Sequence, residues 1–282
     1  MRSPALFATQ HTTISKQDIF ASLRKIEACN SEYLFIHSAL NFGIPLLPKQ
    51  EILKHLSDIL LKLGAKYLIV PTFTFSFCNK ENFDRVHSKS SMGMLNEYLR
   101  KLDIAKRTRD PILSCAIIPC SSQSVPSDLL LLGKHSCGKD SIFDRLHYAE
   151  RVKFLFFGNR VHDCFTHSHY VEEQLQVPYR YNKEFSGYII DQDKQEWETF
   201  ILPVRYANVK AFSDDTLSKA LDAHRAIKRT TLGNGSLEIV EEKQAYTIIA
   251  DNIRNNIDFM LAEPYPREHL DTTYIYEKKV AL

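Results

Sequence analysis

The sequence predicts a layered α/β/α fold with a central mixed sheet and an antiparallel hairpin extension in the C-terminal half. Helical and strand-like patterns alternate along the first half of the chain, an order typical of an α/β sheet. Two longer strand-like runs follow near residues 179–204, joined by a polar turn. The chain has 282 residues, 44% of them hydrophobic, and no linker rich in Pro, Gly or Ser. We therefore expect one domain over residues 1–282.

Helix signals are clearest in the N-terminal part. Ser15 followed by Asp18 is typical of a capping box and predicts a helix over residues 16–28. The apolar spacing between Pro48 and Gly64 predicts a second helix, because proline suits a first helical position and glycine a C-terminal cap. Further helical periodicity lies near residues 91–102, 141–149, 214–227 and 242–256.

Short β-favouring runs alternate with these helices. The runs predicted to form the sheet are Tyr33–Ile36, Tyr67–Val70, Ser114–Ile118 and Phe154–Phe157. The hairpin is predicted from Tyr179–Ile190 and Glu196–Val204, with its turn at Asp191–Lys194. Ligands of an open α/β sheet bind beyond the carboxyl ends of the strands, so the polar loops after these strands are where a site is expected.

Composition and missing motifs exclude several classes of function. Lys and Arg number 36 and Asp and Glu 34, a formal net charge of +2, so a nucleic-acid-binding protein is not expected. No apolar run approaches the roughly 20 residues that a membrane span needs. The N-terminus lacks the apolar stretch of a secretory signal and the six cysteines include no CxxC pair, so we expect a cytoplasmic protein with reduced thiols. Motifs of dinucleotide enzymes, P-loop NTPases and α/β-hydrolases are absent as well.

The segment Thr166–Glu173 is the best candidate for chemistry. Thr166 is placed to precede a helix whose first turn holds His169, and a helix N-terminus disfavours the protonated form of a histidine. Glu172 and Glu173 lie three and four residues on, which puts a carboxylate on the same helical face. His169 is therefore a candidate general base. The alternative is a buried core histidine beside two solvated glutamates, and the pattern alone favours that alternative.

Metal binding and thiol chemistry are weaker hypotheses. His162, His167 and His169 match no common zinc-ligand spacing, so no metal is expected. Cys164 or Cys115 could act as a nucleophile, which would require a covalent acyl-enzyme.

Five segments in order carry a resemblance to a known family. They are Phe35–Leu40, Val70–Thr74, Ser91–Leu95, Arg107–Pro111 with Ser114, and Thr166–Glu173. Together they resemble the aminoglycoside 3-N-acetyltransferase family of acyl-CoA-dependent enzymes, over roughly residues 15–190. Where antibiotic-modifying members usually have His-Pro-x-His-Ser, this chain has Asp110-Pro111-Ile112-Leu113-Ser114. With Val177–Tyr181, that departure is more similar to the branch of the family found in surface-polysaccharide pathways.

The resemblance implies an acyl-CoA-dependent N-acyltransferase. Its donor would be acetyl-CoA or a short hydroxyacyl-CoA such as 3-hydroxybutyryl-CoA. Its acceptor would be the amine of a nucleotide-linked amino-dideoxy sugar, for example a dTDP-linked 3-amino-3,6-dideoxyhexose. His169 would take the amine proton, and Asp110 or, failing that, Glu172 would hold the other ring nitrogen. Thr166 would help to bind the thioester oxyanion.

The resemblance also implies two binding surfaces. Residues expected to bind CoA are His37, Ser38, Ala39, Leu40, Asn41, Phe42, Gly43, Thr72 and Ser114, with backbone N–H groups of the first loop facing the pyrophosphate. Residues expected to bind the acceptor are Thr74, Phe75, Glu173, Tyr179, Arg180, Tyr181 and Lys183. The aromatic and cationic run Tyr179–Lys183 suits a sugar diphosphate, although the exposed face of a hairpin explains it equally well.

Two further hypotheses about function stay open. An aminoglycoside-like antibiotic could be the acceptor, in which case a carboxylate-rich cleft is expected around the polycation. The chain could instead be a non-catalytic CoA-binding or scaffold relative. The sequence also leaves the number of subunits open, with a homodimer as one option.

Overall fold

A seven-stranded sheet runs through the centre of the protein. The computed structural model describes residues 4–212 and 215–274. In spatial order the strands are β12 (Lys228–Leu232), β13 (Gly235–Glu241), β9 (Val152–Phe157), β3 (Tyr33–Ser38), β5 (Tyr67–Pro71), β8 (Cys115–Pro119) and β7 (Lys106–Arg107). β3 is parallel to both β9 and β5, whereas the outer pairs are antiparallel. The sheet is mixed, as predicted, and the carboxyl ends of β9, β3 and β5 meet at one edge.

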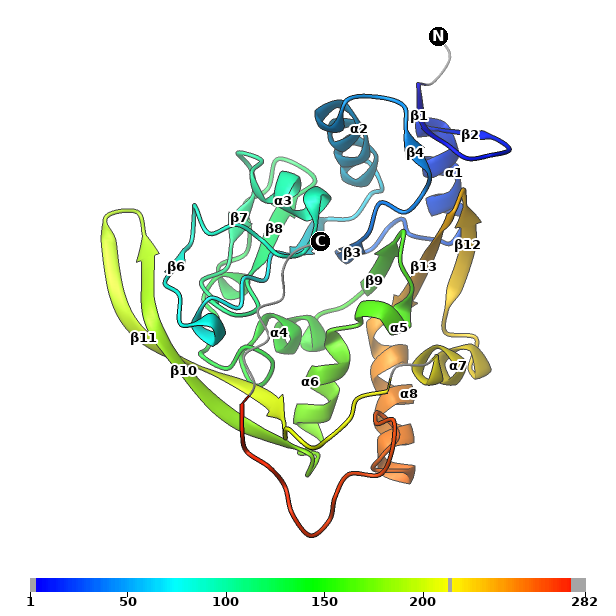
Figure 1. Cartoon of the computed structure of the whole chain (residues 1–282). Coiled ribbons are helices and arrows are strands. Elements are labelled where there is room, and N and C mark those ends of the chain that lie inside the picture. The colour runs from blue at the N-terminus through cyan, green and yellow to red at the C-terminus, as the bar shows by residue number, and fades with distance from the viewer. Residues whose placement is uncertain (1–3, 213–214, 275–282) are drawn as a thin grey trace.

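Helices cover both faces of this sheet. They are α1 (Lys16–Lys25), α2 (Lys49–Leu61), α3 (Met94–Arg100), α4 (Ile142–Tyr148), α5 (Val161–Cys164), α6 (His167–Gln174), α7 (Thr216–Ala223) and α8 (Glu242–Asn255), and short 3₁₀ turns lie at Phe77–Asn79 and Ser127–Leu129. In Figure 1, α1, α2 and α3 lie on one side of the strands, and α4, α6 and α8 on the other. Two apolar clusters separate in the same way. The predicted α/β/α layering is confirmed.

The inner strands β9, β3, β5 and β8 are mostly apolar because both of their faces are buried. Along β3, Phe35 packs with the cluster that contains α4, α6 and α8, and Leu34 and Ile36 pack with the cluster that contains α1 and α2. Along β9, Phe154 and Phe156 face the first cluster and Leu155 and Phe157 the second. This explains why periodicity located these strands as short unbroken apolar runs.

The predicted helices form, with small differences at their ends. The capping box before α1 is present, because Asp18 N donates to Ser15 Oγ and Ser15 N donates to the Asp18 carboxylate. α1 stops at Lys25 rather than at residue 28, since Glu27 takes a left-handed φ of 60° that no helix continues. α7 likewise ends before Arg225, which has a φ of 54°. Residue 214, the predicted first residue of that helix, lies outside the described residues.

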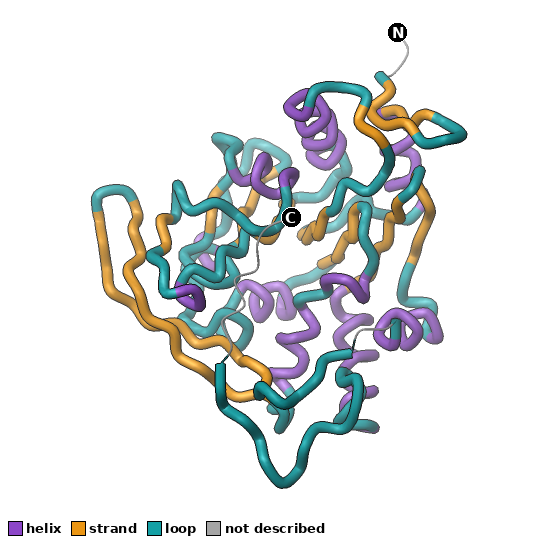
Figure 2. The backbone as a smooth tube through the Cα atoms, in the orientation of Figure 1, coloured by secondary structure: helices purple, strands orange, loops and turns teal. Residues whose placement is uncertain are grey.

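The predicted hairpin is confirmed and forms a long arm. β10 (Arg180–Asp191) pairs with β11 (Lys194–Arg205) in antiparallel register, and Gln192 in the turn has a left-handed φ of 58°. Figure 2 shows the two strands standing beside the central sheet, and the short strand β6 (Phe83–Asp84) adds to β10 in parallel. Inward-facing Phe185 and Ile189 are buried. The arm is therefore anchored along one face.

Two groups of strands, and the two-residue strands β6 and β7, are absent from the prediction. One is a small N-terminal sheet of β1 (Ala5–Ala8), β2 (Thr13–Ser15) and β4 (Ile44–Pro45). The other is the hairpin of β12 and β13, which joins the central sheet beside β9. The turn signal was present, since Gly233-Asn234 is a dipeptide typical of a two-residue hairpin loop.

Backbone packs directly on backbone where β3 and β9 end. Ala39 N donates to Phe157 O at 2.9 Å, and Gly158 N donates to Ser236 O at 2.8 Å. Gly158 has a φ of +86°, and a Cβ added there would lie 1.7 Å from Ala39 O. Only glycine fits this position, so the loops after β3 and β9 are held against each other.

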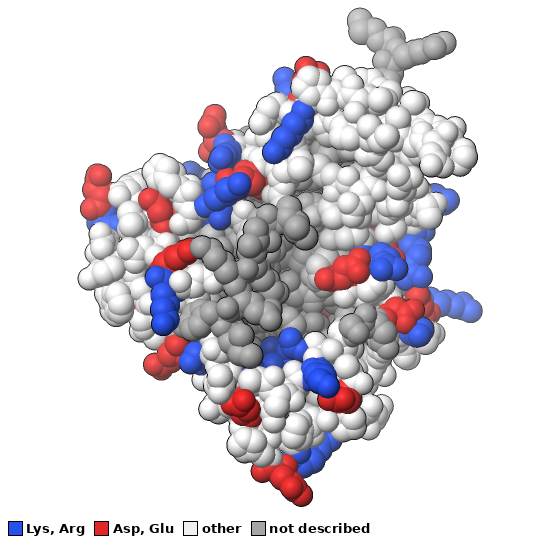
Figure 3. All heavy atoms as spheres, viewed as in Figure 1, with Lys and Arg blue, Asp and Glu red and all other residues white. Residues whose placement is uncertain are grey.

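Charges of both signs are distributed over the surface. Figure 3 shows acidic and basic side chains in small mixed groups on the face viewed, which agrees with the near-balanced composition. Across residues 4–212 and 215–274, every helix is too short or too polar to cross a bilayer.

His37 lies inside the protein near the end of β3. Its ring is 4% exposed and stacks on Phe156 with centroids 5.3 Å apart and an interplanar angle of 9°. Within the described ranges, His37 Nε2 has no hydrogen-bond partner. Burial, with a smaller effect of His167, lowers the pKa of His37 to about 3. The residue is therefore neutral in the folded protein.

Replacing His37 with Phe should make the protein less sensitive to acid. The pKa of His37 is about 3 when folded and 6.5 when exposed, so between these values the unfolded chain binds more protons. The free energy of unfolding therefore falls as the pH falls through this window, by about 2 kcal/mol at pH 5 from this residue. Urea unfolding of wild type and His37→Phe at pH 7.5 and pH 5 measures the difference.

Phenylalanine keeps the stacking on Phe156 and removes the unpartnered nitrogen. The matched control is His269→Phe at an exposed histidine, which should leave the pH dependence unchanged. An equal fall in stability between the two pH values in wild type and His37→Phe would contradict the assignment.

Candidate active site

The candidate site is centred on His169, in the first turn of α6. His169 Nδ1 donates to Glu172 Oε2 at 2.9 Å, one helical turn further on. The His169 side chain is 45% exposed, and in the described part of the chain its other nitrogen, Nε2, has no hydrogen-bond partner. The ring is thus held by one edge and accessible at the other.

Glu172 is a buried carboxylate shared by three donors. Its side chain is 2% exposed and accepts hydrogen bonds from His169 Nδ1, from Arg180 Nη2 at 2.8 Å, and from Tyr179 OH at 3.0 Å. Burial raises the pKa of this carboxyl, but Arg180 and His169 outweigh burial and lower it to about 2. Glu172 therefore stays ionised and fixes the orientation of the imidazole.

The environment of His169 favours the neutral ring. Burial lowers its pKa, Arg180 lowers it further, and Glu172 only partly opposes these effects. Arg180 Nη2 also lies 3.0 Å from His169 Nδ1, but two donors do not bond to each other, so the proton on Nδ1 points to Glu172. Nε2 then carries the free lone pair. A neutral imidazole with an accessible lone pair is able to act as a general base.

The other two histidines considered as metal ligands, His167 and His162, contact side chains other than Glu172. His167 is fully buried, and its Nε2 lies 2.8 Å from Glu242 Oε1. His147 Nδ1 contacts the same oxygen at 2.8 Å, and His162 Nδ1 lies 3.1 Å from Ser218 Oγ. Among the described residues no set of three or more His, Cys, Asp or Glu side chains is placed to hold a metal.

Asp110 lies away from His169, in contrast to the first of the two predicted partners. Its carboxylate accepts hydrogen bonds from Ile112 N at 2.8 Å, Leu113 N at 2.9 Å and Ser136 Oγ at 3.0 Å. Asp110 thus stabilises the turn between β7 and β8. The structure puts Glu172, the second predicted partner, on the imidazole.

Thr166 immediately precedes α6 but does not cap it through its side chain. Its hydroxyl donates to Cys164 O at 3.4 Å, and its carbonyl accepts from His169 N at 3.0 Å. An oxyanion role for Thr166 stays a prediction. The two candidate thiols, Cys164 and Cys115, have pKa values raised by burial, so both are protonated and poorly suited to nucleophilic attack.

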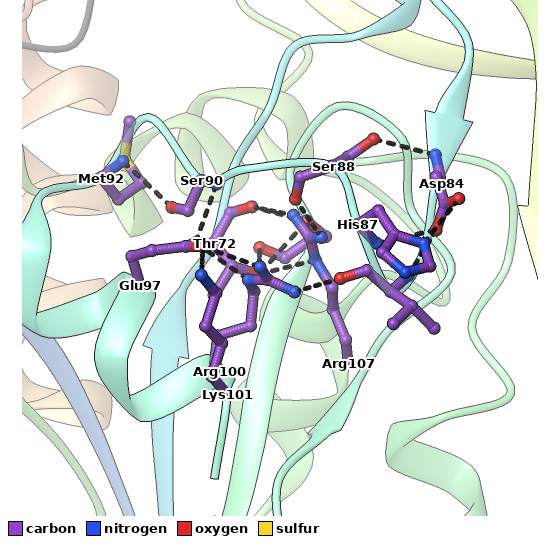
Figure 4. A network of polar contacts seen from close by, with 12 residues as sticks. Thr72, Asp84, His87, Ser88, Ser90, Met92, Glu97, Arg100, Lys101 and Arg107 are labelled. Atoms are coloured by element: carbon purple, nitrogen blue, oxygen red, sulfur yellow. Dashed lines mark hydrogen bonds and ion pairs between the residues drawn. The ribbon is translucent and has the colours of Figure 1, made fainter.

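Thr72 and Ser114 belong to a buried structural network rather than to a binding surface. Both are fully buried, and Arg107 Nε lies 3.3 Å from Thr72 Oγ1 and 3.2 Å from Ser114 Oγ. Arg107 also donates to Thr72 O and Ser88 O and packs over the Phe83 ring at 4.9 Å, and Figure 4 shows it reaching Thr72 and Ser88. The prediction that Thr72 and Ser114 contact CoA does not fit this arrangement.

The predicted CoA loop is partly strand. His37 and Ser38 are the last residues of β3, and Ser38 Oγ donates to Asn96 Oδ1 at 2.7 Å. Phe42 is buried with its ring against Phe7 and Phe157. Within the predicted range, Ala39, Leu40, Asn41 and Gly43 are at least partly exposed and lie just beyond β3.

The predicted acceptor residues have separate roles. Tyr179 and Arg180 contact Glu172 and thereby support the imidazole, and their role in acceptor binding stays a prediction. Glu173 Oε1 lies 3.2 Å from His135 Nε2. The remaining four have other neighbours. Thr74 Oγ1 donates to Pro111 O, and the Phe75 ring lies edge-on to Phe73. The Tyr181 ring is tilted by 37° against Tyr206, and Lys183 lies over the Phe185 ring.

Sequence reasoning did not identify Arg205 as part of this region. Arg205 ends β11 directly opposite Arg180 in the hairpin register, and it influences the pKa of His169. The register of the predicted hairpin was the signal that could have indicated it.

Comparison with known proteins places this arrangement in a family. A family model described as aminoglycoside 3-N-acetyltransferase matches residues 36–253, well over half of the chain. The chain belongs to the aminoglycoside 3-N-acetyltransferase family. The resemblance found in the sequence is confirmed, and the protein is an N-acyltransferase, as predicted.

Solved structures share the fold of this acetyltransferase at low identity. AAC(3)-Xa has a TM-score of 0.71 and 18% identity, covering 89% of this chain and 95% of that protein. AAC-VIa bound to sisomicin has a TM-score of 0.69 and 16% identity, covering 85% and 97%. AAC-IIIb in a binary complex with CoASH has a TM-score of 0.69 and 13% identity, covering 90% and 99%. No curated protein sequence matches the chain.

Replacing Arg107 with Lys should destabilise the acetyltransferase by about 3 kcal/mol. A lysine keeps the charge but lacks the planar fork that serves several acceptors at once, so buried carbonyl and hydroxyl oxygens lose their donors. Urea unfolding measures the loss. Arg24→Lys, at an exposed position on α1, is the control, and equal stabilities of the two variants would contradict a structural role for Arg107.

Proposed function

We propose that this chain transfers an acetyl group from acetyl-CoA to a primary amine of an aminoglycoside-type acceptor. The observation that carries the proposal is the accessible neutral imidazole of His169, held by the buried carboxylate of Glu172. The family supports the donor and the acceptor class, since one structural neighbour is described with CoASH and another with sisomicin.

In the proposed reaction, the side chains move one proton. As the amine attacks the thioester carbonyl, its proton passes to His169 Nε2. Glu172 stabilises the imidazolium that forms, because its charge lies 2.9 Å from the protonated Nδ1. The proton then leaves with the CoA thiol.

A donor site beside the loop after β3 fits the structure. The loop Ala39–Gly43 lies at the carboxyl edge of the sheet, the common position of ligands in α/β folds. A cavity of about 540 Å³ lies by the neighbouring turns and is lined by Thr9, Gln10, His11, Thr12, Gly233 and Asn234. Asn234 N donates to Phe42 O, so this cavity borders the loop. Its polar lining suits the hydrophilic end of CoA.

A nucleotide-linked amino sugar is the second candidate acceptor. It is favoured by one observation, an arginine near His169 that has no carboxylate at ion-pair distance in the described part of the chain. Glu172 is occupied by Arg180 and Glu173 lies beside His135, whereas Arg205 has no carboxylate partner among the described residues. A polycationic antibiotic needs free carboxylates, and a diphosphate needs cations. A 3-hydroxybutyryl donor belongs to this second proposal.

Replacing His169 with Ala should lower kcat for acyl transfer on the order of 10³-fold while leaving CoA affinity within a factor of about two. Glu172→Gln, which keeps the size of the side chain and removes its charge, should lower kcat as well. CoA release measures turnover, and calorimetry measures CoA binding. His224→Ala, at an exposed histidine, is the control. Unchanged turnover in His169→Ala would remove this residue from the mechanism.

A panel of acceptors should separate the two acceptor classes. CoA release is measured with sisomicin and gentamicin on one side and a dTDP-linked 3-amino-3,6-dideoxyhexose on the other, each with acetyl-CoA and 3-hydroxybutyryl-CoA. The proposal expects the highest kcat/KM with acetyl-CoA and an aminoglycoside. A higher value with the nucleotide sugar would favour the second candidate, and no turnover with either class would support a non-catalytic relative.

A further inference from the structure

An uncompensated arginine lies beside the Glu172–His169 pair. Arg205 is the last residue of β11 and is half-buried. Within residues 4–212 and 215–274, its side chain makes no hydrogen bond and has no carboxylate at ion-pair distance. Arg180 lies at ion-pair distance from Glu172, and His135 from Glu173. Arg205 differs from them, and its unpaired charge calls for a functional explanation.

The hairpin register determines where Arg205 lies. It is directly opposite Arg180, and residues opposite each other in an antiparallel pair project from the same face with Cβ atoms about 5 Å apart. Arg180 Nη2 is 2.8 Å from Glu172 Oε2 and 3.0 Å from His169 Nδ1. Two guanidinium groups side by side repel each other, and only one of them is neutralised by Glu172.

Among the described groups that face His169, Arg205 is the charged side chain without an ion-pair partner. Helix α6 contributes Glu172 and Glu173. Tyr179 comes from the residue before β10, Arg180 from β10 and Arg205 from β11, and His135 and Cys137 come from the segment before α4. Tyr179 and Cys137 are neutral because burial raises the pKa of each. Glu172 offsets Arg180 and Glu173 lies against His135. Arg205 is therefore left without a counter-ion in the described part of the chain.

We propose that Arg205 is a positioning residue whose fixed charge keeps His169, and the amine that arrives beside it, in their uncharged forms. A guanidinium remains protonated at all working pH values, so this charge is permanent. A second positive charge on the imidazole or on the incoming nitrogen raises the electrostatic energy of the site. The electrostatic influence of Arg205 on His169 agrees with this direction.

This inference rests on the proposed transfer reaction. An ammonium group has no lone pair, so the acceptor must lose one proton before it attacks. The new C–N bond then forms as the C–S bond breaks. One of the two amine protons passes to His169 Nε2 and then to the departing sulfur of CoA, and the other stays on the amide nitrogen. Arg205 favours the loss of a proton from the acceptor ammonium and the neutral form of His169, without contacting the reacting atoms.

Replacing Arg205 with Gln should raise the pKa of His169 on the order of half a pH unit. Two-dimensional NMR of the imidazole nitrogens during a pH titration measures it directly. Arg205→Lys, which keeps the charge, should restore the wild-type value, and Arg205→Met gives a second neutral variant if the glutamine variant folds poorly. Arg225→Gln removes one exposed arginine elsewhere and should leave His169 unchanged.

Kinetics provides the second readout. The acid limb of the kcat/KM profile should move to higher pH by the same amount in Arg205→Gln, with little change above pH 8. A His169 titration that is identical in wild type and in the neutral variants would overturn the inference. Absence of turnover with every acceptor would instead overturn the proposed function, and the NMR titration would still decide the role of Arg205.

Discussion

The geometry of the site depends on one buried anion. Glu172 is almost completely removed from water, and such a charge is stable only when donors surround it. Its three donors come from His169 on its own helix and from Tyr179 and Arg180 at the start of β10. Glu172 therefore joins α6 to the hairpin arm and at the same time selects the tautomer of His169. The same carboxylate thus supports both the packing of the hairpin arm and the orientation of the proposed base.

A second buried charge, Arg107, is stabilised by neutral oxygens instead of by an ion of opposite charge. Arg107 has no carboxylate at ion-pair distance among the described residues and is satisfied by neutral oxygens of Thr72, Ser114 and Ser88. Burial lowers its pKa to about 9, so it remains charged at neutral pH. Hydrogen bonds to a cation inside the protein are strong because water does not compete for them. This cation binds the residue after β5, the residue before β8 and the segment that contains Ser88.

Local patterns in the sequence were sufficient for the layers and for the principal pair of residues. Apolar runs located β3, β5, β8 and β9. The three-residue spacing from His169 to Glu172 indicated a carboxylate on the same helical face, although Asp110 was the first predicted partner. The patterns failed where partners are far apart in the chain. The sequence suggested that Thr72 and Ser114 bind CoA. In the structure their oxygens accept hydrogen bonds from Arg107, which is 35 residues from Thr72. Arg205 acts only through the pairing of β10 with β11. Contacts of this kind depend on register and packing, which single-sequence periodicity does not contain.

Gly158 gives the scaffold one position that does not tolerate change. Any side chain there would collide with the carbonyl of Ala39, so the junction between the loops after β3 and β9 requires a residue without a Cβ atom. A combinatorial library built to retarget this enzyme should randomise the segments on either side and leave residue 158 as encoded. Natural variation in these loops is also expected to keep glycine at position 158.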